Sequence, residues 1–325
     1  MKHLICILVA AVLAVMPAAA QTDAQFTQFY EVPSIYNPAA IGLTDFVRLR
    51  GAGRLQWVGI DGAPRTFDIS ANMPYKVFNK RLGAGIVMQQ ESIGLYSSLN
   101  LNAQIGYKLR KFGGEFTGAI QIGMFDQRFK GSESYVPDGD DYHQGADDAI
   151  PTADLHGTAL DLGAGIWFQH KLWHAGISAT HLTAPTIRMG GESGSGGTDE
   201  AIYEFHAPRT LYFMAGCNIP IKNTLFELTP SLMVKSDFTF TGAEIMARAR
   251  YNKFLSFGVG YRYDDAITAT IAAEIKNFYI GYSFDYATSA LHSASAGSHE
   301  VVVGYSLKLD LGEKNRNRHR SIRFM

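Results

Sequence analysis

Residues 95–109 alternate between apolar and polar side chains, and this period of two is the feature that most constrains the fold. The odd positions are apolar or small, with Ser97 as the one polar member, and the even positions are polar or glycine except Tyr96. Such alternation is typical of a β-strand with one apolar and one polar face. At about 3.3 Å per residue, a strand of this length crosses a tilted membrane. The segment is therefore predicted to be a transmembrane strand.

The first twenty residues have the pattern of a secretory signal peptide. A basic start precedes an apolar run over residues 4–16, and three alanines at 18–20 precede Gln21. Cleavage is predicted after Ala20. The apolar run is too short for a membrane-spanning helix. The mature chain then keeps a single cysteine, Cys217, which excludes an intramolecular disulfide.

Average composition does not separate this chain from a soluble enzyme. The mean hydropathy is −0.04 and the net charge is −1. Outer-membrane barrels have such averages because each strand combines an apolar face with a polar one. The 33 glycines, 16 tyrosines and 20 phenylalanines favour a barrel with aromatic girdles. A near-neutral charge gives no argument for nucleic-acid binding.

Strand patterns recur along the whole chain and predict an all-β fold, a closed antiparallel transmembrane β-barrel of about 14 strands in the outer membrane. A secreted β-sandwich would also alternate, but its strands average about five or six residues, and many of these are longer. The predicted strands cover residues 46–58, 64–75, 81–92, 95–110, 114–129, 157–170, 172–183, 209–220, 224–236, 242–251, 254–264, 266–276, 278–287 and 299–311.

The predicted connections sort into two classes, short and long, on opposite sides. Segments 130–156, 184–208 and 288–298 are long and fall on one side, whereas the alternate turns are brief. This arrangement is typical of barrels with short periplasmic turns and long extracellular loops. Both termini are then predicted to be periplasmic, with a barrel domain at 46–311 and a basic tail at 312–325.

The segment between the cleavage site and the first strand, residues 21–45, contains Q-F-T-Q-F-Y and Y-N-P-A-A-I-G. Its prolines and the Asn37-Pro38 pair predict an ordered turn rather than a regular helix or strand. Such a segment either braces the barrel interior or presents a docking surface to a partner. Arg54 and Gln56 share the polar face of the first strand and are predicted to face the lumen. The candidate partner-binding residues are Gln25, Gln28, Tyr30, Asn37, Pro38, Arg54 and Gln56.

These motifs resemble the PorP/SprF family of outer-membrane proteins in the type IX secretion system of Bacteroidota. The resemblance rests on the N-terminal segment, on R-L-Q-W at 54–57 and on P-R-T-F-D-I-S at 64–70. T-H-L-T-A-P at 180–185 and S-H-E-V-V-V-G-Y at 298–305 extend it along the mature chain, although Thr27 and Phe29 stand where the family usually has Ser and Tyr.

The resemblance implies a non-enzymatic component of protein secretion, without cofactor or metal. It would act as a scaffold or adaptor for periplasmic machinery, or in surface placement of cargo. The implied partners are outer-membrane lipid, periplasmic ring, lipoprotein or motor components, and secreted cargo; neither nucleic acid nor a small-molecule substrate is expected. The alternative is a passive channel for small solutes. An adaptor predicts a plugged barrel, whereas a channel predicts an open lumen.

Other candidate sites are weaker. Segment 130–156 carries seven acids, but its D-G-D-D spacing is not the twelve-residue calcium loop, so a solvated acidic loop is the simpler interpretation. His170, His174 and His181 lie around one predicted hairpin without a zinc or hydrolase motif. The glycine-rich segment 190–197 lacks the G-K-S/T of a phosphate loop. The basic tail either docks an acidic partner or is disordered.

Overall fold

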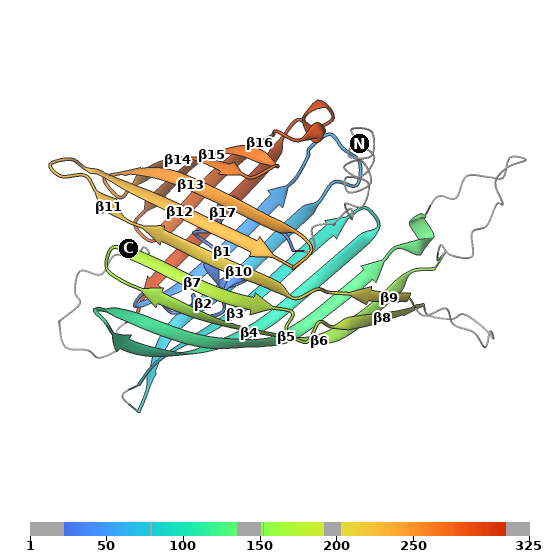
Figure 1. Cartoon of the computed structure of the whole chain (residues 1–325), viewed down its shortest axis with the longest axis horizontal. Helices are drawn as coiled ribbons and strands as arrows, with labels where there is room; N and C mark the ends of the chain where they lie inside the picture. Colours follow the sequence, from blue (N-terminus) through green and yellow to red (C-terminus); the bar gives the residue numbers. More distant parts are fainter. Residues whose placement is uncertain (1–22, 79, 135–150, 152, 192–202, 310–325) are drawn as a thin grey trace, which may run out of the picture.

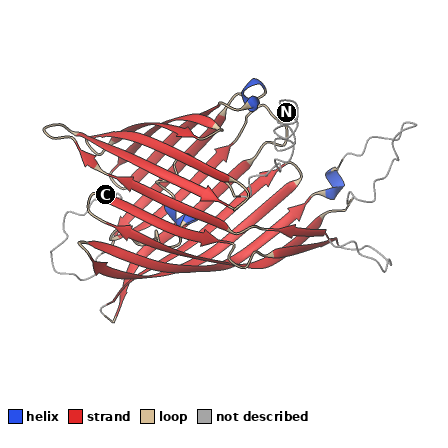
Figure 2. Ribbon diagram, viewed as in Figure 1, coloured by secondary structure: helices blue, strands red, loops and turns tan. Residues whose placement is uncertain are grey.

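Antiparallel strands form a closed barrel in the computed structural model, which describes residues 23–309 except 79, 135–150, 152 and 192–202 (Figures 1 and 2). The strands are β1 (Phe46–Leu55), β2 (Arg65–Val77), β3 (Lys80–Ile93), β4 (Tyr96–Lys111), β5 (Gly114–Phe129), β6 (Leu155–Gln169), β7 (Trp173–Thr180), β8 (Thr186–Gly191), β9 (Tyr203–His206), β10 (Thr210–Cys217), β11 (Ile219–Pro220), β12 (Phe226–Ser236), β13 (Thr241–Tyr251), β14 (Leu255–Arg262), β15 (Ala266–Ile275), β16 (Phe278–Ala287) and β17 (Ser298–Lys308). The described helices are short: α2 (Pro33–Tyr36), η1 (Gly131–Glu133) and η2 (Ala290–Ser293).

The barrel wall contains fourteen strands, as the sequence predicted. β10 and β11 both pair with β12 and act as one wall strand, whereas β8 and β9 form a separate hairpin. β1 pairs with both β2 and β17, so the wall has no open edge. Closure matters because unpaired backbone groups could not be satisfied in lipid. The ends of the wall strands lie within three residues of the predicted positions.

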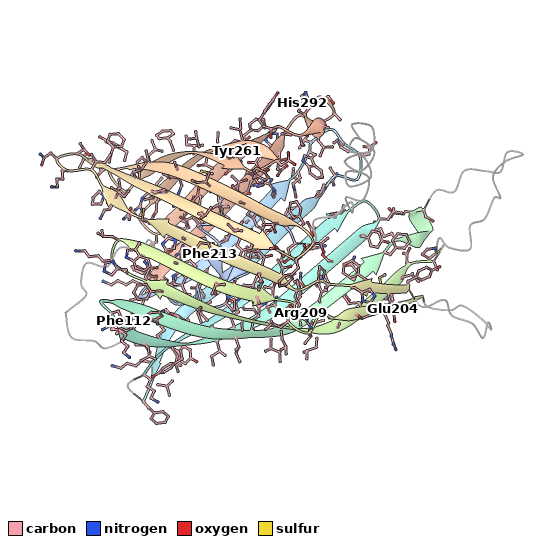
Figure 3. All side chains as sticks on the ribbon, viewed as in Figure 1. Phe112, Glu204, Arg209, Phe213, Tyr261 and His292 are labelled. Atoms are coloured by element: carbon pink, nitrogen blue, oxygen red, sulfur yellow. The ribbon has the colours of Figure 1, made fainter. Side chains whose placement is uncertain are left out.

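The wall alternates between a lumen face and an outer face. In β15, Thr268 and Thr270 are 0% and 8% exposed, whereas Ile267 and Ile271 are 53% and 46% exposed. The same alternation runs around the barrel, where large apolar side chains project outward (Figure 3). An apolar outer band with a polar interior is the arrangement that a bilayer requires. Within the described ranges, no helix has the length and apolar character needed to span a membrane.

The two ends of the barrel differ in their connections. At one end, here called the short-turn end, β4 joins β5 through residues 112–113 and β15 joins β16 through 276–277. At the other, the long-loop end, the extended connections β5–β6, β7–β10 and β16–β17 all lie, as predicted. Figure 1 shows the hairpin of β8 and β9 on the right, at the long-loop end.

The segment predicted as the loop 184–208 contains the hairpin of β8 and β9, which the sequence reasoning missed. Ile187 and Met189 of β8 are 0% and 4% exposed, and they pack in an apolar cluster with Phe125, Phe129 and Leu155 of β5 and β6. The ladder extends from β6 to β8 through only two residue pairs. These strands are too short to show clear alternation in the sequence. Their packing against β5 and β6 stabilises them, and the sequence does not reveal that packing.

Candidate functional site: the plugged lumen

Residues 23–45, here called the plug, fill the interior of the barrel. Phe26, Thr27, Gln28 and Asn37 have exposed fractions of 0%, and the apolar members pack against Met and aromatic side chains of the wall. The plug carries one helical turn, α2, which departs from the prediction that its prolines would forbid helix. Pro33 lies in the first turn of α2, where the missing N–H has no intrahelical partner to lose.

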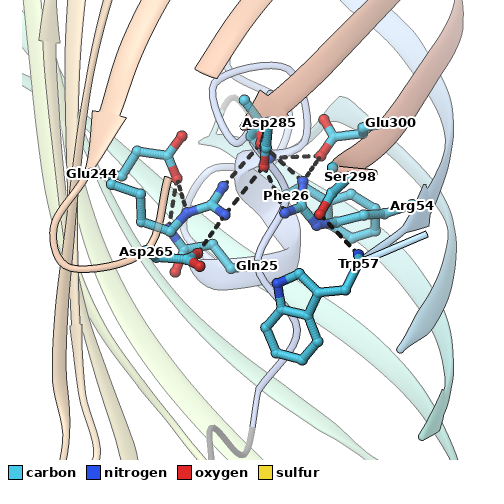
Figure 4. A network of polar contacts seen from close by, with 12 residues as sticks. Gln25, Phe26, Arg54, Trp57, Glu244, Asp265, Asp285, Ser298 and Glu300 are labelled. Atoms are coloured by element: carbon cyan, nitrogen blue, oxygen red, sulfur yellow. Dashed lines mark hydrogen bonds and ion pairs between the residues drawn. The ribbon is translucent and has the colours of Figure 1, made fainter. Parts of the chain in front are cut away.

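A buried ion-pair network joins the plug to the wall in the half nearer the long loops (Figure 4). Arg54 of β1 lies 2.7 Å from Asp285 of β16 and 3.1 Å from Glu300 of β17, both measured between guanidinium nitrogen and carboxylate oxygen. The Glu300 carboxylate accepts hydrogen bonds from the backbone N–H groups of Thr27, at 2.7 Å, and Gln28, at 2.8 Å. One wall carboxylate therefore fixes the backbone of the plug while its charge is balanced by Arg54.

A second guanidinium extends the network. Arg262 of β14 donates to Glu244 of β13 at 2.9 Å and to Asp285 at 3.2 Å. The Gln25 amide also donates to Glu244, at 2.6 Å. The Thr27 hydroxyl accepts from both Arg54 and Arg262, at 2.9 Å each. Because charges buried in this way are costly to leave unpaired, the network favours one position of the plug over alternatives.

The described chain begins at Asp23, near the long-loop end. Its carboxylate accepts from the Tyr212 hydroxyl and lies 3.3 Å from His181 Nε2, and its carbonyl accepts from Lys235 at 2.9 Å. His181 Nδ1 lies 3.1 Å from Asp161. Burial disfavours the charged imidazole, but the two carboxylates outweigh it and raise the pKa of His181 to about 10. Burial also works against Asp23 ionisation, yet His181 and the hydrogen bonds hold the pKa of Asp23 below its ordinary value.

The other half of the plug is held by the wall near the short-turn end. Glu31 lies 3.3 Å from Arg48 and 3.4 Å from Arg50 of β1. Burial opposes the Glu31 charge, but Arg50 and then Arg48 outweigh it and lower the pKa of Glu31. Asp45, where the plug enters β1, pairs with Arg81 of β3.

Close packing between plug and wall requires glycine. Gly42 has φ of +55°, and a Cβ there would lie 2.8 Å from the backbone nitrogen of Pro74 in β2. The Gly42 N–H donates to the Asn72 side chain at 3.1 Å. A Cβ on Gly165 of β6 would lie 2.3 Å from Oδ1 of Asn37. These positions leave room for the plug backbone and the Asn37 amide.

All seven candidate partner-binding residues are buried, and none is displayed at the surface in this conformation. Gln25 and Arg54 are members of the ion-pair network. The Gln28 side chain accepts a hydrogen bond from the Tyr279 hydroxyl at 2.9 Å. The Asn37 amide donates to the Ile166 carbonyl at 3.1 Å and accepts from the Ala39 N–H at 2.8 Å. The expectation that Arg54 and Gln56 face inward agrees with their exposed fractions of 1% and 8%. The partner-binding role itself stays a prediction. The buried members are Gln25, Gln28, Tyr30, Asn37, Pro38, Arg54 and Gln56.

Sequence reasoning missed four wall residues that hold the plug, namely Glu244, Arg262, Asp285 and Glu300, and it singled out His181 only as part of a weak histidine cluster. A signal for them exists. Each of the four strand residues is charged on the lumen phase of its strand, opposite the apolar outer face. The sequence does not reveal which of these charges meet.

The weaker candidates find no further support. Most acids of segment 130–156 lie outside the described residues; of those described, Glu133 pairs with Lys130 and Asp154 accepts from Ser132. His174 stacks on Trp167 with ring centroids 5.1 Å apart. No group of three potential metal ligands is found in the described part of the chain. The signal peptide and basic tail, and most of the glycine-rich segment, also lie outside the described residues.

The model of the type IX secretion system membrane proteins PorP/SprF matches residues 18–305. The chain belongs to the PorP/SprF family. Together with the barrel fold, membership makes it an integral outer-membrane protein of this secretion system. No curated protein sequence matches the chain.

Solved outer-membrane barrels show distant similarity. The translocator domain of the autotransporter NalP from Neisseria meningitidis is 11% identical with a TM-score of 0.44, covering 81% of this chain and 87% of its own. The toluene transporter TodX from Pseudomonas putida is 12% identical with a TM-score of 0.45, covering 89% and 95%. Omp33 from Acinetobacter baumannii is 9% identical with a TM-score of 0.43, covering 82% and 100%. Similarities this weak say nothing about function.

Proposed function

We propose that this PorP/SprF protein is a non-enzymatic, non-conducting adaptor of the type IX secretion machinery. The observation that carries the proposal is the plug: residues 23–45 occupy the lumen and are tied to both halves of the wall by buried charges. A lumen filled in this way supports an adaptor rather than a passive solute channel, which needs an open path. A fourteen-stranded wall is also too narrow for a folded cargo domain.

The proposal includes an orientation. The short turns face the periplasm and the long loops face the cell exterior, as is usual for outer-membrane barrels. The short-turn mouth would then meet periplasmic ring, lipoprotein or motor components, while the long-loop end would meet secreted cargo. Asp23, the first described residue, contacts Tyr212 and Lys235 near the long-loop end, while Lys308 lies at the short-turn end. These two residues therefore lie at opposite ends of the barrel, and the periplasmic location of both termini stays a prediction.

The first test is the secreted proteome of a strain that lacks the gene. We expect cargo with C-terminal sorting domains to accumulate in the periplasm, and plasmid-borne wild-type gene to restore its secretion. A tagged copy should also retain periplasmic machinery components after mild detergent extraction, whereas an unrelated barrel tagged in the same way should not. Normal secretion together with no retained component would contradict the adaptor role.

A further inference from the structure

A polar cavity lies between the plug and the wall at the short-turn end. It encloses about 620 Å³ of empty space, including the solvent to which it opens. Tyr30 and Glu31 of the plug form one side. Residues of β7, β10 and β12 to β16 near the short-turn end form the other, including Arg248, Lys253 and Tyr279. Of the candidate residues singled out in the sequence, Tyr30 and His174 line this cavity.

The charge of the cavity is positive. Its lining carries Arg248, Arg250 and Lys253 against the carboxylates Glu31 and Glu274, and Arg250 is paired with Glu227 at 3.6 Å. Glu31 is already engaged by two further arginines, Arg48 and Arg50, as described above. The local excess of guanidinium and ammonium groups favours an anionic ligand, and low-dielectric walls strengthen that field.

Arg248 is held in a geometry suited to binding a carboxylate. Its guanidinium carbon lies 3.3 Å from the centroid of the Tyr30 ring, so the planar group stacks on the plug. Its Nε is buried and has no hydrogen-bond partner among the described residues. A stacked guanidinium keeps its edge free for paired N–H donors, the geometry that carboxylates accept.

We infer that this cavity binds a carboxylate of an acidic peptide segment, with Arg248 as its central donor. The inference deepens the proposed adaptor role and rests on it, because a periplasmic protein would supply the segment. Glu or Asp side chains enter from the short-turn mouth, Arg248 takes the carboxylate, and Lys253 adds positive charge beside it.

The test measures binding of a fluorescein-labelled hexaglutamate peptide to the full mature barrel in nanodiscs by fluorescence anisotropy. We expect saturable binding that weakens as salt is raised, because the attraction is partly screened. Hexaglutamine should not bind. Arg248→Gln should weaken binding about tenfold or more, because a charge-assisted hydrogen-bonded pair is lost. Arg248→Lys keeps the charge but not the planar fork and should fall between the two.

The matched control is Arg65→Gln, which removes the same charge from the exposed first residue of β2 at the opposite end. It should leave hexaglutamate affinity within twofold of wild type. Folding of each variant is checked by its heat-dependent migration on gels, and Arg248→Lys keeps the test valid if Arg248→Gln does not fold. Equal affinity of wild type and the Arg248 variants, or equal loss in Arg65→Gln, would overturn the site. Inorganic phosphate binding more tightly than the peptide would overturn the peptide assignment.

This test is separable from that of the adaptor role. If hexaglutamate fails to bind while machinery components still co-purify with the barrel, the cavity inference fails and the adaptor role stands. If the components do not co-purify while hexaglutamate binds through Arg248, the reverse holds.

Discussion

At the residue scale, the charged side chains inside the barrel act as fixed partners of one another. Arg54 joins carboxylates from β16 and β17 to the plug, and all three groups are at most 2% exposed. A buried pair adds little when compared with apolar residues, but removing one member leaves the other charge uncompensated. The network therefore specifies where the plug lies more than it adds to stability.

Replacing Arg54 should be costly. Arg54→Gln leaves Glu300 without its guanidinium partner and Asp285 with Arg262 alone, and we expect the free energy of unfolding to fall by about 3–5 kcal/mol. Urea unfolding in lipid vesicles measures this change. Arg65→Gln, at an exposed position, should change it by less than about 0.5 kcal/mol. A loss in Arg54→Gln no greater than in this control would contradict the role of the network.

His181 gives the plug a defined dependence on pH. Its folded pKa of about 10 lies above the ordinary value of 6.5. The stabilisation is thus complete below pH 6.5 and is lost as the pH rises through 10. We expect the difference in unfolding free energy between wild type and His181→Asn to shrink by about 2–4 kcal/mol between pH 6.5 and 10. Subtracting the variant cancels the titration of groups that do not interact with His181 or Asp23, and a constant difference would refute the assignment.

At the scale of elements, the wall strands and the inward position of the N-terminal segment could be predicted from sequence, but the contacts of the plug could not. Strand bounds follow from local alternation, which the bilayer enforces over long segments. The plug has no such period, because most of its side chains are buried against the wall. The interior position of Arg54 was predictable from its phase on β1, but its contact with Asp285 joins residues 231 apart in sequence. The hairpin of β8 and β9 was missed for the related reason that its strands are short.

The motifs that indicated the family have a common structural role. Thr27 of the N-terminal motif, Arg54 of R-L-Q-W and Glu300 of S-H-E-V meet in one network. His181 of T-H-L-T-A-P meets Asp23. Motifs that individually give little indication of the family thus contact one another around the plug. These contacts are a structural reason for their occurrence in one chain.

The junction of plug and wall can be tested with two glycines of equal backbone conformation. Gly42 and Gly94 both have φ of +55°, but a Cβ would contact the Pro74 backbone at Gly42 and nothing within 4 Å at Gly94. Gly94→Ala should cost only the backbone strain, about 1–2 kcal/mol. Gly42→Ala should cost more and should expose the plug, which contains Phe and Tyr but no Lys or Arg, to chymotrypsin in intact barrels. Equal stability and equal cleavage of the two variants would show that close packing at Gly42 is unimportant.

At the scale of the whole molecule, a closed fourteen-stranded wall surrounds a plug that takes no part in the strand pairing of that wall. The ladder from β1 to β17 is complete without any plug residue, since every wall strand pairs with two others. The wall and the plug can therefore be separated experimentally.

Removing the plug should convert the barrel into a channel. Deletion of residues 23–44 from the mature chain should leave a folded barrel with far higher single-channel conductance in planar bilayers than wild type. The intact protein should conduct little, because the lumen is filled. Large, steady conductance of the intact protein would favour the solute-channel alternative and contradict the proposed adaptor.

The contacts of the plug also determine the order in which the molecule can be assembled. Thr27 bonds to residues 258 and 273 positions later, so the plug cannot make these contacts until the last strands are in place. Such long-range closure is slow. Pairing of β1 with β17 then encloses the plug, and the carboxylates that bind the plug lie on β16 and β17 themselves. Barrel closure and capture of the N-terminal segment are in effect a single late step of biogenesis, and a chain that stalls before β16 would leave its leading end unbound.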